Sequence, residues 1–138
     1  VNADQEMVSK MWKFGEHAGI AFQIKDDLFD YEKGNHSGKQ YGTDIKEKKM
    51  TLPLIFSLSK MNYSEKREVI NIVKNNNNDK HKVDYVIQKV YETGGILYAE
   101  SKMKEYHQKA LDILFEFPKN EMRDSLEMLV NYTIERKK

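Results

Sequence analysis

The sequence contains no cysteine, only two prolines and seven glycines, and no apolar run long enough to span a membrane. The absence of cysteine excludes a disulfide framework, a thiolate metal site and a cysteine nucleophile, and it fits a reducing compartment such as the cytoplasm. Because proline, glycine and strand-like alternation are scarce, the chain is expected to consist of helices. The 138 residues carry a net charge of +1, so no overall field attracts nucleic acid.

The spacing of apolar residues predicts one all-α domain of several helices. Thr51 and Ser64 are expected to cap two of these helices, and Trp12 is expected to lie in the core. The basic residues 136–138 are expected to form a solvated tail. The predicted helices cover residues 4–32, a short stretch from about residue 51, 64–74, 80–93, 96–117 and 121–136, with an irregular polar segment at 33–50.

Three aspartates occur within two helical turns of a mostly apolar stretch, which reads GIAFQIKDDLFD over residues 19–30. At these spacings Asp26, Asp27 and Asp30 repel one another, by about 0.2–0.5 kcal/mol per pair on a helix. A bound cation would relieve this repulsion, and hard carboxylate oxygens favour Mg²⁺. The alternative is a solvated acidic face that happens to hold three aspartates.

The next segment combines glycines with four lysines and reads GNHSGKQYGTDIKEKKMTLP over residues 34–53. Carboxylates followed closely by ammonium groups suit a phosphorylated ligand, because Mg²⁺ bridges carboxylate and diphosphate oxygens while lysines neutralise the remaining charge. The alternative is an ordinary solvated lysine-rich loop. Asp44 is expected to order this loop.

The two motifs together resemble the trans-isoprenyl (polyprenyl) diphosphate synthases. Residues 22–30, FQIKDDLFD, are similar to the second aspartate-rich motif of this family, and residues 38–53 are similar to its glycine–lysine loop. Gln40 and Lys48 stand where the family usually has proline and glycine. The resemblance covers essentially the whole chain and is greatest to octaprenyl-type long-chain synthases. It implies an isoprenoid-synthase helical bundle of which residues 1–138 are the C-terminal part, without the N-terminal half and the first aspartate-rich motif.

The resemblance also implies an activity. Such enzymes use Mg²⁺ to elongate an allylic prenyl diphosphate with isopentenyl diphosphate, giving a trans-polyprenyl diphosphate, and we expect a cytoplasmic homodimer. Half of the metal cluster would lie outside this chain, so we expect the chain to be inactive alone. The resemblance implies three catalytic residues, Gln23, Lys39 and Lys49. These three residues and Phe22 would bind the substrate. The metal ligands would be Asp26, Asp27 and Asp30.

Two other functions are open at this stage. One is a noncatalytic or partner-dependent subunit that keeps the same fold. The other is a class I terpene cyclase, which shares the bundle and the Mg²⁺ chemistry but usually has an Asn/Asp, Ser/Thr, Glu pattern in its second motif. The sequence instead has three aspartates followed by the glycine–lysine loop, which favours the prenyltransferase.

Overall fold

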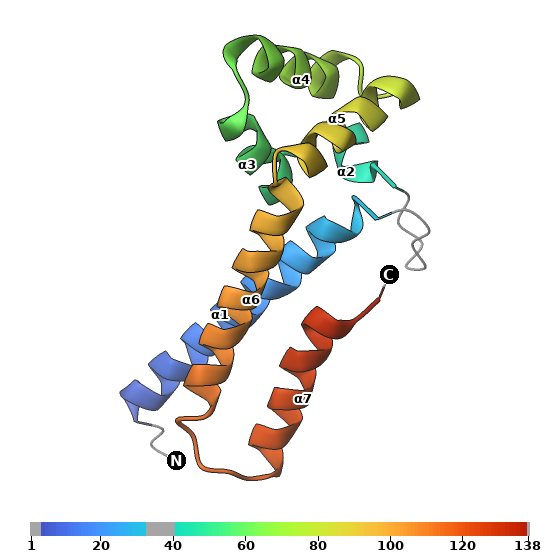
Figure 1. The fold of residues 1–138 in the computed structure, drawn as a ribbon. Coiled ribbons are helices and arrows are strands. Elements are labelled where there is room, and N and C mark those ends of the chain that lie inside the picture. Colours follow the sequence, from blue (N-terminus) through green and yellow to red (C-terminus); the bar gives the residue numbers. More distant parts are fainter. Residues whose placement is uncertain (1–3, 33–40, 138) are drawn as a thin grey trace. The chain divides into compact units, whose positions relative to one another are not determined.

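The computed structural model describes residues 4–32 and 41–137, and this part of the chain is helical with no strand (Figure 1). The all-α prediction is therefore confirmed. No helix in the described ranges is both long and apolar enough to cross a membrane. The helices are α1 (Gln5–Phe29), α2 (Thr43–Lys46), α3 (Leu52–Lys60), α4 (Tyr63–Asn75), α5 (Lys80–Glu92), α6 (Gly95–Leu114) and α7 (Glu121–Glu135).

The helices form two compact units, and α1 and α6 each contribute to both. We call the first the terminal unit: it contains the described residues up to Lys25 and those from Ser101 to Arg136. The central unit contains the described residues between Asp26 and Glu100, together with Lys137. The boundary in α1 falls between Lys25 and Asp26, so the aspartate motif belongs to the central unit.

The terminal unit packs α1 against the C-terminal part of α6 and against α7. Phe14 of α1 is 6% exposed and contributes the largest side chain to its core. Trp12, which was expected in the core, is 77% exposed, so this prediction was wrong. Residues two positions apart on a helix point in directions that differ by about 200°. The helix face that buries Phe14 therefore leaves Trp12 on the opposite side. The core residues are Phe14, Ala110, Leu111, Leu114 and Val130, with Ala18, Ile113 and Leu126 packed against them.

The central unit is built from α2 to α5 around a core rich in valine and isoleucine. β-branched side chains on α4 and α5 face the apolar sides of α2 and α3, and burial of this surface stabilises the unit by roughly 25 cal/mol per Å². Its buried residues are Tyr31, Ile45, Leu54, Val69, Ile72, Val73, Val83, Val86, Ile87 and Val90.

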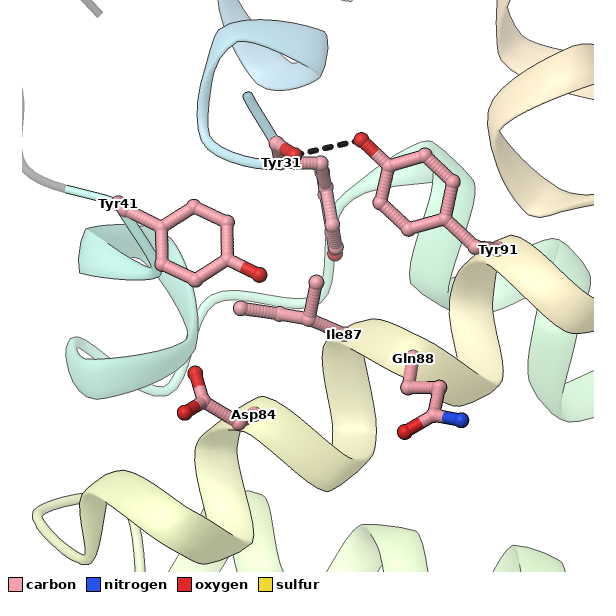
Figure 2. A pocket seen from close by; sticks show the side chains of 6 residues that line it. All are labelled: Tyr31, Tyr41, Asp84, Ile87, Gln88 and Tyr91. Atoms are coloured by element: carbon pink, nitrogen blue, oxygen red, sulfur yellow. Dashed lines mark hydrogen bonds between the residues drawn. The ribbon is translucent and has the colours of Figure 1, made fainter. Parts of the chain in front are cut away.

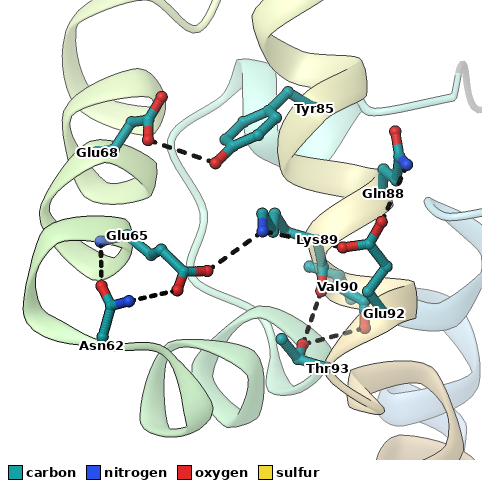
Figure 3. Close-up of polar contacts among 9 residues, drawn as sticks. All are labelled: Asn62, Glu65, Glu68, Tyr85, Gln88, Lys89, Val90, Glu92 and Thr93. Carbon is teal, nitrogen blue, oxygen red and sulfur yellow. Dashed lines mark hydrogen bonds and ion pairs between the residues drawn. The ribbon is translucent and has the colours of Figure 1, made fainter.

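The start of α4 is fixed by a reciprocal cap between Asn62 and Glu65. The Glu65 amide donates to Asn62 Oδ1 at 2.8 Å, and Asn62 Nδ2 donates to Glu65 Oε1 at 2.6 Å (Figure 3). The Asn62 side chain thus gives the Glu65 amide a hydrogen-bond acceptor at a helix end where the first amides lack partners within the helix, and the Glu65 side chain holds Asn62 in place. The prediction that Ser64 caps this helix was wrong, because the helix begins one residue earlier, at Tyr63.

Polar contacts also join α4 to α5. Lys89 Nζ lies 3.2 Å from Glu65 Oε2, and Tyr85 donates its hydroxyl proton to Glu68 Oε2 at 3.3 Å (Figure 3). Both contacts are at the edge of the core, so they add less to stability than the buried apolar side chains between the two helices.

The polar segment expected to be irregular contains the short helix α2. Gly42 precedes this helix with φ of 77°, a left-handed conformation that glycine adopts without steric cost. Ile45 of α2 is completely buried and joins the helix to the central core. α1 ends at Phe29 rather than near residue 32, because the chain turns at Asp30 and Tyr31.

Candidate metal and diphosphate site

The last turn of α1 presents two of the three motif aspartates to ligands. Asp26 and Asp27 are half-buried, whereas Asp30, just beyond the end of the helix, is completely buried. The three carboxylates that the sequence placed in one metal site therefore differ in burial. No group of three or more His, Cys, Asp or Glu side chains within the described ranges is arranged to hold a metal ion.

Two adjacent carboxylates nevertheless fit Mg²⁺. This ion prefers hard oxygen ligands, keeps several waters and is usually bound through one or two carboxylates together with substrate phosphate oxygens. Asp26 and Asp27 supply that donor set without a cage made only of protein. The chemistry of these side chains therefore suits a metal ion that arrives with a diphosphate.

Asp30 connects the end of α1 to α2. Its Oδ1 accepts a hydrogen bond from the Asp44 amide at 3.0 Å, and its carbonyl accepts one from the Gly42 amide at 3.0 Å. The carbonyl of Asp44 in turn accepts from the Lys49 amide at 2.8 Å. Asp44 is 2% exposed, so these bonds are shielded from water. The backbone of Lys49 is thus tied to the end of α1 through Asp44.

Tyr31 fixes the same region from the other side. Its ring is buried, and its hydroxyl lies 3.4 Å from Thr51 Oγ1. Burial raises the pKa of the Tyr31 hydroxyl far above its ordinary value, so it stays protonated. Thr51 occupies the N-cap position of α3 as predicted, but its side chain makes no capping hydrogen bond. Tyr91 of α5 donates its hydroxyl proton to the Tyr31 carbonyl at 2.6 Å (Figure 2).

A cavity that the sequence did not indicate lies beside this junction. Its volume is about 560 Å³, and three tyrosine rings from separate parts of the central unit form its walls (Figure 2). No motif brings these rings together in the sequence, so only the packing of α5 against the end of α1 reveals the cavity. The lining residues are Tyr31, Tyr41, Asp84, Ile87, Gln88 and Tyr91.

Lys49 is an exposed cation in the electrostatic field of the aspartate motif. Its Nζ lies 2.8 Å from Glu47 Oε2. This hydrogen bond is the main cause that raises the pKa of Lys49, and the negative charges of Asp44 and Asp26 act in the same direction. Lys49 therefore stays charged to a pH above its ordinary pKa. A shared diphosphate site of Lys49 and Asp26 stays a prediction.

Lys48 has a backbone conformation that L-residues rarely adopt. Its φ is 62°, in the left-handed region, at the position where the resembled family usually has glycine. This conformation costs an L-residue about 1–2 kcal/mol. A glycine at this position would avoid that cost, but it would also make the unfolded chain more flexible, which offsets part of the gain in stability. The strain falls directly before Lys49.

We expect Lys48→Gly to be more stable than Lys48→Ala by about 1 kcal/mol in the free energy of unfolding. Both variants remove the same charge, and only alanine keeps the Cβ atom. Urea unfolding of the two proteins measures this difference. Equal stability would show that the left-handed conformation of Lys48 carries no strain.

Phe22 and Gln23 belong to the terminal unit, where both are exposed. The Arg136 guanidinium lies 4.0 Å from the centroid of the Phe22 ring, and its Nη2 donates to the Phe22 carbonyl at 3.1 Å. Arg136 is therefore not part of a solvated tail, and that prediction was wrong. Apolar periodicity cannot show a cation–π contact between residues 114 positions apart. Lys39, the other predicted diphosphate ligand, lies outside the described residues.

The chain is thus an all-α protein in which two adjacent half-buried carboxylates, Asp26 and Asp27, end a long helix, and backbone hydrogen bonds link Lys49 to Asp30 through Asp44. The sequence matches the Polyprenyl synthetase family over residues 1–90. The chain therefore belongs to the polyprenyl synthetase family, a family of prenyltransferases.

Curated relatives and solved structures agree with this assignment. The chain is 31% identical to a geranylgeranyl pyrophosphate synthase of Geoglobus acetivorans, with 96% of the chain and 40% of that protein aligned. It is 30% identical to an octaprenyl diphosphate synthase of Haemophilus influenzae, with 89% and 37% aligned. A crystal structure of geranylgeranyl pyrophosphate synthase from Bacteroides thetaiotaomicron superposes with a TM-score of 0.86 at 32% identity, covering 99% of the chain and 45% of that protein.

The chain spans about two-fifths of the length of the curated relatives it matches. Identity is nearly the same to a geranylgeranyl and to an octaprenyl synthase, although these names refer to products of different length. The family is thus established by similarity.

Proposed function

We propose that this chain supplies the second aspartate-rich motif of a Mg²⁺-dependent prenyltransferase. The complete protein would elongate an allylic prenyl diphosphate with isopentenyl diphosphate to a trans-polyprenyl diphosphate. The proposal is carried by the family match over residues 1–90, and it is supported by the backbone hydrogen bonds that link Lys49 to Asp30 of the aspartate motif through Asp44. Carboxylate and ammonium groups are the two kinds of side chain that a metal-bound diphosphate requires.

Departure of the diphosphate is the difficult step of this reaction. The allylic C–O bond breaks, and its electron pair leaves with the diphosphate. The olefin of isopentenyl diphosphate attacks the remaining allylic cation, and the cation formed loses a proton to a base to give the new double bond. Bound Mg²⁺ would neutralise negative charge that develops on the leaving group. Asp26 and Asp27 would hold the metal ion, and Lys49 would donate hydrogen bonds to diphosphate oxygens.

The roles of three other residues follow from the resemblance and remain predictions. Gln23 would face the reacting centre beside Phe22, and Lys39 would be the second lysine on the diphosphate. A cytoplasmic location and a homodimeric assembly of the complete protein are likewise predictions.

Glu47 competes with the diphosphate for Lys49, because both are anions that the same ammonium group can bind. Exposed ion pairs are weak, so we expect Glu47→Gln to tighten Mg²⁺-dependent binding of inorganic diphosphate by about 1.5- to 5-fold. Isothermal titration calorimetry measures this affinity. Glu105→Gln, which removes a carboxylate that pairs with Lys102 in the terminal unit, is the control and should leave the affinity unchanged. Weaker binding by Glu47→Gln would show that Glu47 helps to hold the ligand.

Product analysis of the complete protein tests the proposed function. We expect the protein encoded by the full reading frame, given farnesyl diphosphate, isopentenyl diphosphate and Mg²⁺, to form a longer linear prenyl diphosphate. The 138-residue chain assayed alone should form none, because the proposed reaction needs two aspartate-rich motifs and these residues contain one. A folded complete protein that elongates nothing would favour a partner-dependent subunit. Steady turnover by the 138-residue chain alone would refute the proposal that the reaction needs a second aspartate-rich motif.

A further inference from the structure

We propose that Asp30 is a positioning residue and not a metal ligand: its side chain caps α2 and thereby places Lys49. The capping role depends only on the structure. The consequence for the ligand rests on the proposed function. Three observations support this assignment: the missing side-chain cap at the N-terminus of α2, the hydrogen bonds that link Asp30 to the backbone of Lys49, and the burial of Asp30.

The N-terminus of α2 lacks a cap of its own. The first amides of a helix have no partner within the helix, and an N-cap side chain usually accepts one of them. The N-cap residue here is Gly42, which has no side chain and makes no capping hydrogen bond. The Asp44 amide in the first turn instead donates to Asp30 Oδ1 at 3.0 Å. Asp30, fourteen residues earlier in the chain, therefore does what a capping residue would do.

Two hydrogen bonds lead from this carboxylate to the backbone of Lys49. Asp30 Oδ1 accepts from the Asp44 amide, and the Asp44 carbonyl accepts from the Lys49 amide at 2.8 Å. The Gly42 amide also donates to the Asp30 carbonyl at 3.0 Å, so Asp30 holds the start of α2 at two points. Loss of the carboxylate would therefore loosen α2 and the backbone that carries the Lys49 ammonium.

The surroundings of Asp30 suit a fixed support. Asp30 is 0% exposed, whereas Asp26 and Asp27 are half-buried on the preceding turn. Two further contacts hold the adjacent residue, Tyr31. Tyr91 donates to the Tyr31 carbonyl (Figure 2), and the Tyr31 hydroxyl lies 3.4 Å from Thr51 Oγ1. The hydrogen bond from the Asp44 amide to Asp30 Oδ1 is buried, so water does not compete for it. The Oδ1 atom of Asp30 is thus bonded to the backbone of α2.

Two substitutions separate a positioning role from a metal-binding role. Asp30→Asn keeps a side-chain oxygen that can accept the Asp44 amide but removes the negative charge, whereas Asp30→Ala removes both. Amide hydrogen exchange of the chain without ligand is the first measurement. We expect exchange at Asp44 and Lys49 to be at least tenfold faster in Asp30→Ala and within about threefold of the unmodified chain in Asp30→Asn. Unchanged exchange in Asp30→Ala would overturn the proposal.

Titration of inorganic diphosphate at several Mg²⁺ concentrations is the second measurement. We expect Asp30→Asn to require the same Mg²⁺ concentration as the unmodified chain and Asp30→Ala to bind diphosphate about tenfold more weakly. If Asp30→Asn raises the required Mg²⁺ concentration tenfold while exchange at Asp44 is unchanged, Asp30 is a metal ligand and the proposal is wrong. If Asp30→Ala does not fold, Asp30→Asn still decides between the two roles.

The two measurements also separate this proposal from the proposed function. Hydrogen exchange needs no ligand, so it reports whether Asp30 fixes α2 and Lys49 even if the chain binds no diphosphate. Absence of Mg²⁺-dependent diphosphate binding by the unmodified chain would count against the proposed function, whereas altered Mg²⁺ dependence in Asp30→Asn would count against the role assigned to Asp30.

Discussion

Replacement of Asp26 by asparagine in the complete protein is expected to lower kcat for prenyl transfer by about 10²- to 10³-fold, the range seen when one group that stabilises transition-state charge is removed. Asparagine has nearly the same size as aspartate, so the fold should be retained. The carboxylate that would hold Mg²⁺ against the leaving diphosphate is lost. Steady-state assays with farnesyl diphosphate, isopentenyl diphosphate and Mg²⁺ measure the change.

The control for this prediction is Asp112→Asn, on an exposed face of α6 in the terminal unit. It removes the same charge from the protein at a position with no proposed role, so its kcat should stay within about twofold. Equal activity of the Asp26 and Asp112 variants would exclude Asp26 as a metal ligand. A rise in KM at constant kcat would instead indicate that Asp26 contributes only to substrate binding.

Replacement of Gly95 by alanine is expected to lower the free energy of unfolding by about 2–4 kcal/mol. Gly95 begins α6 directly against α3, and an added Cβ would lie 2.5 Å from the Pro53 carbonyl oxygen and in contact with Ser57 Oγ. These two atoms form a buried hydrogen bond of 2.8 Å. The methyl group therefore has to displace the backbone of α3 and break this bond. Urea or thermal unfolding of the chain measures the loss.

Gly15 provides a matched control with the opposite expected sign. It lies within α1, and an added Cβ at this position meets no atom within 4 Å. Because alanine favours a helix interior over glycine, Gly15→Ala should raise the free energy of unfolding by about 0.5–1 kcal/mol. A Gly95→Ala variant as stable as the unmodified chain would show that α3 and α6 can move apart at little cost.

The sequence was sufficient to predict the features that depend on local patterns. Apolar periodicity located the long helices, and the order of the aspartate motif and the glycine–lysine loop indicated the family. The limits of the helices were less accurate: α1 ends three residues before the predicted position, and α4 begins one residue earlier than predicted. Such differences are expected where capping contacts, rather than apolar spacing, decide the end of a helix.

Features that depend on contacts between distant segments could not be predicted in this way. α2 has four residues, so it is too short to show a helical period, and it is held by Asp30 and by burial of Ile45. The spacing of Asp26, Asp27 and Asp30 placed all three on one polar stripe, because a helical wheel cannot show that the chain turns after Phe29 and buries the third. Burial of Phe14 rather than Trp12 likewise depends on which face meets α6.

The most direct test of the proposed site is calorimetric titration of the 138-residue chain with inorganic diphosphate, with and without Mg²⁺. We predict binding that requires Mg²⁺, is weakened about tenfold or more in Asp26→Asn and in Lys49→Gln, and is unchanged in Asp112→Asn. Binding that is independent of Mg²⁺, or equal in all four proteins, would contradict the assignment of Asp26 and Lys49 to one metal and diphosphate site.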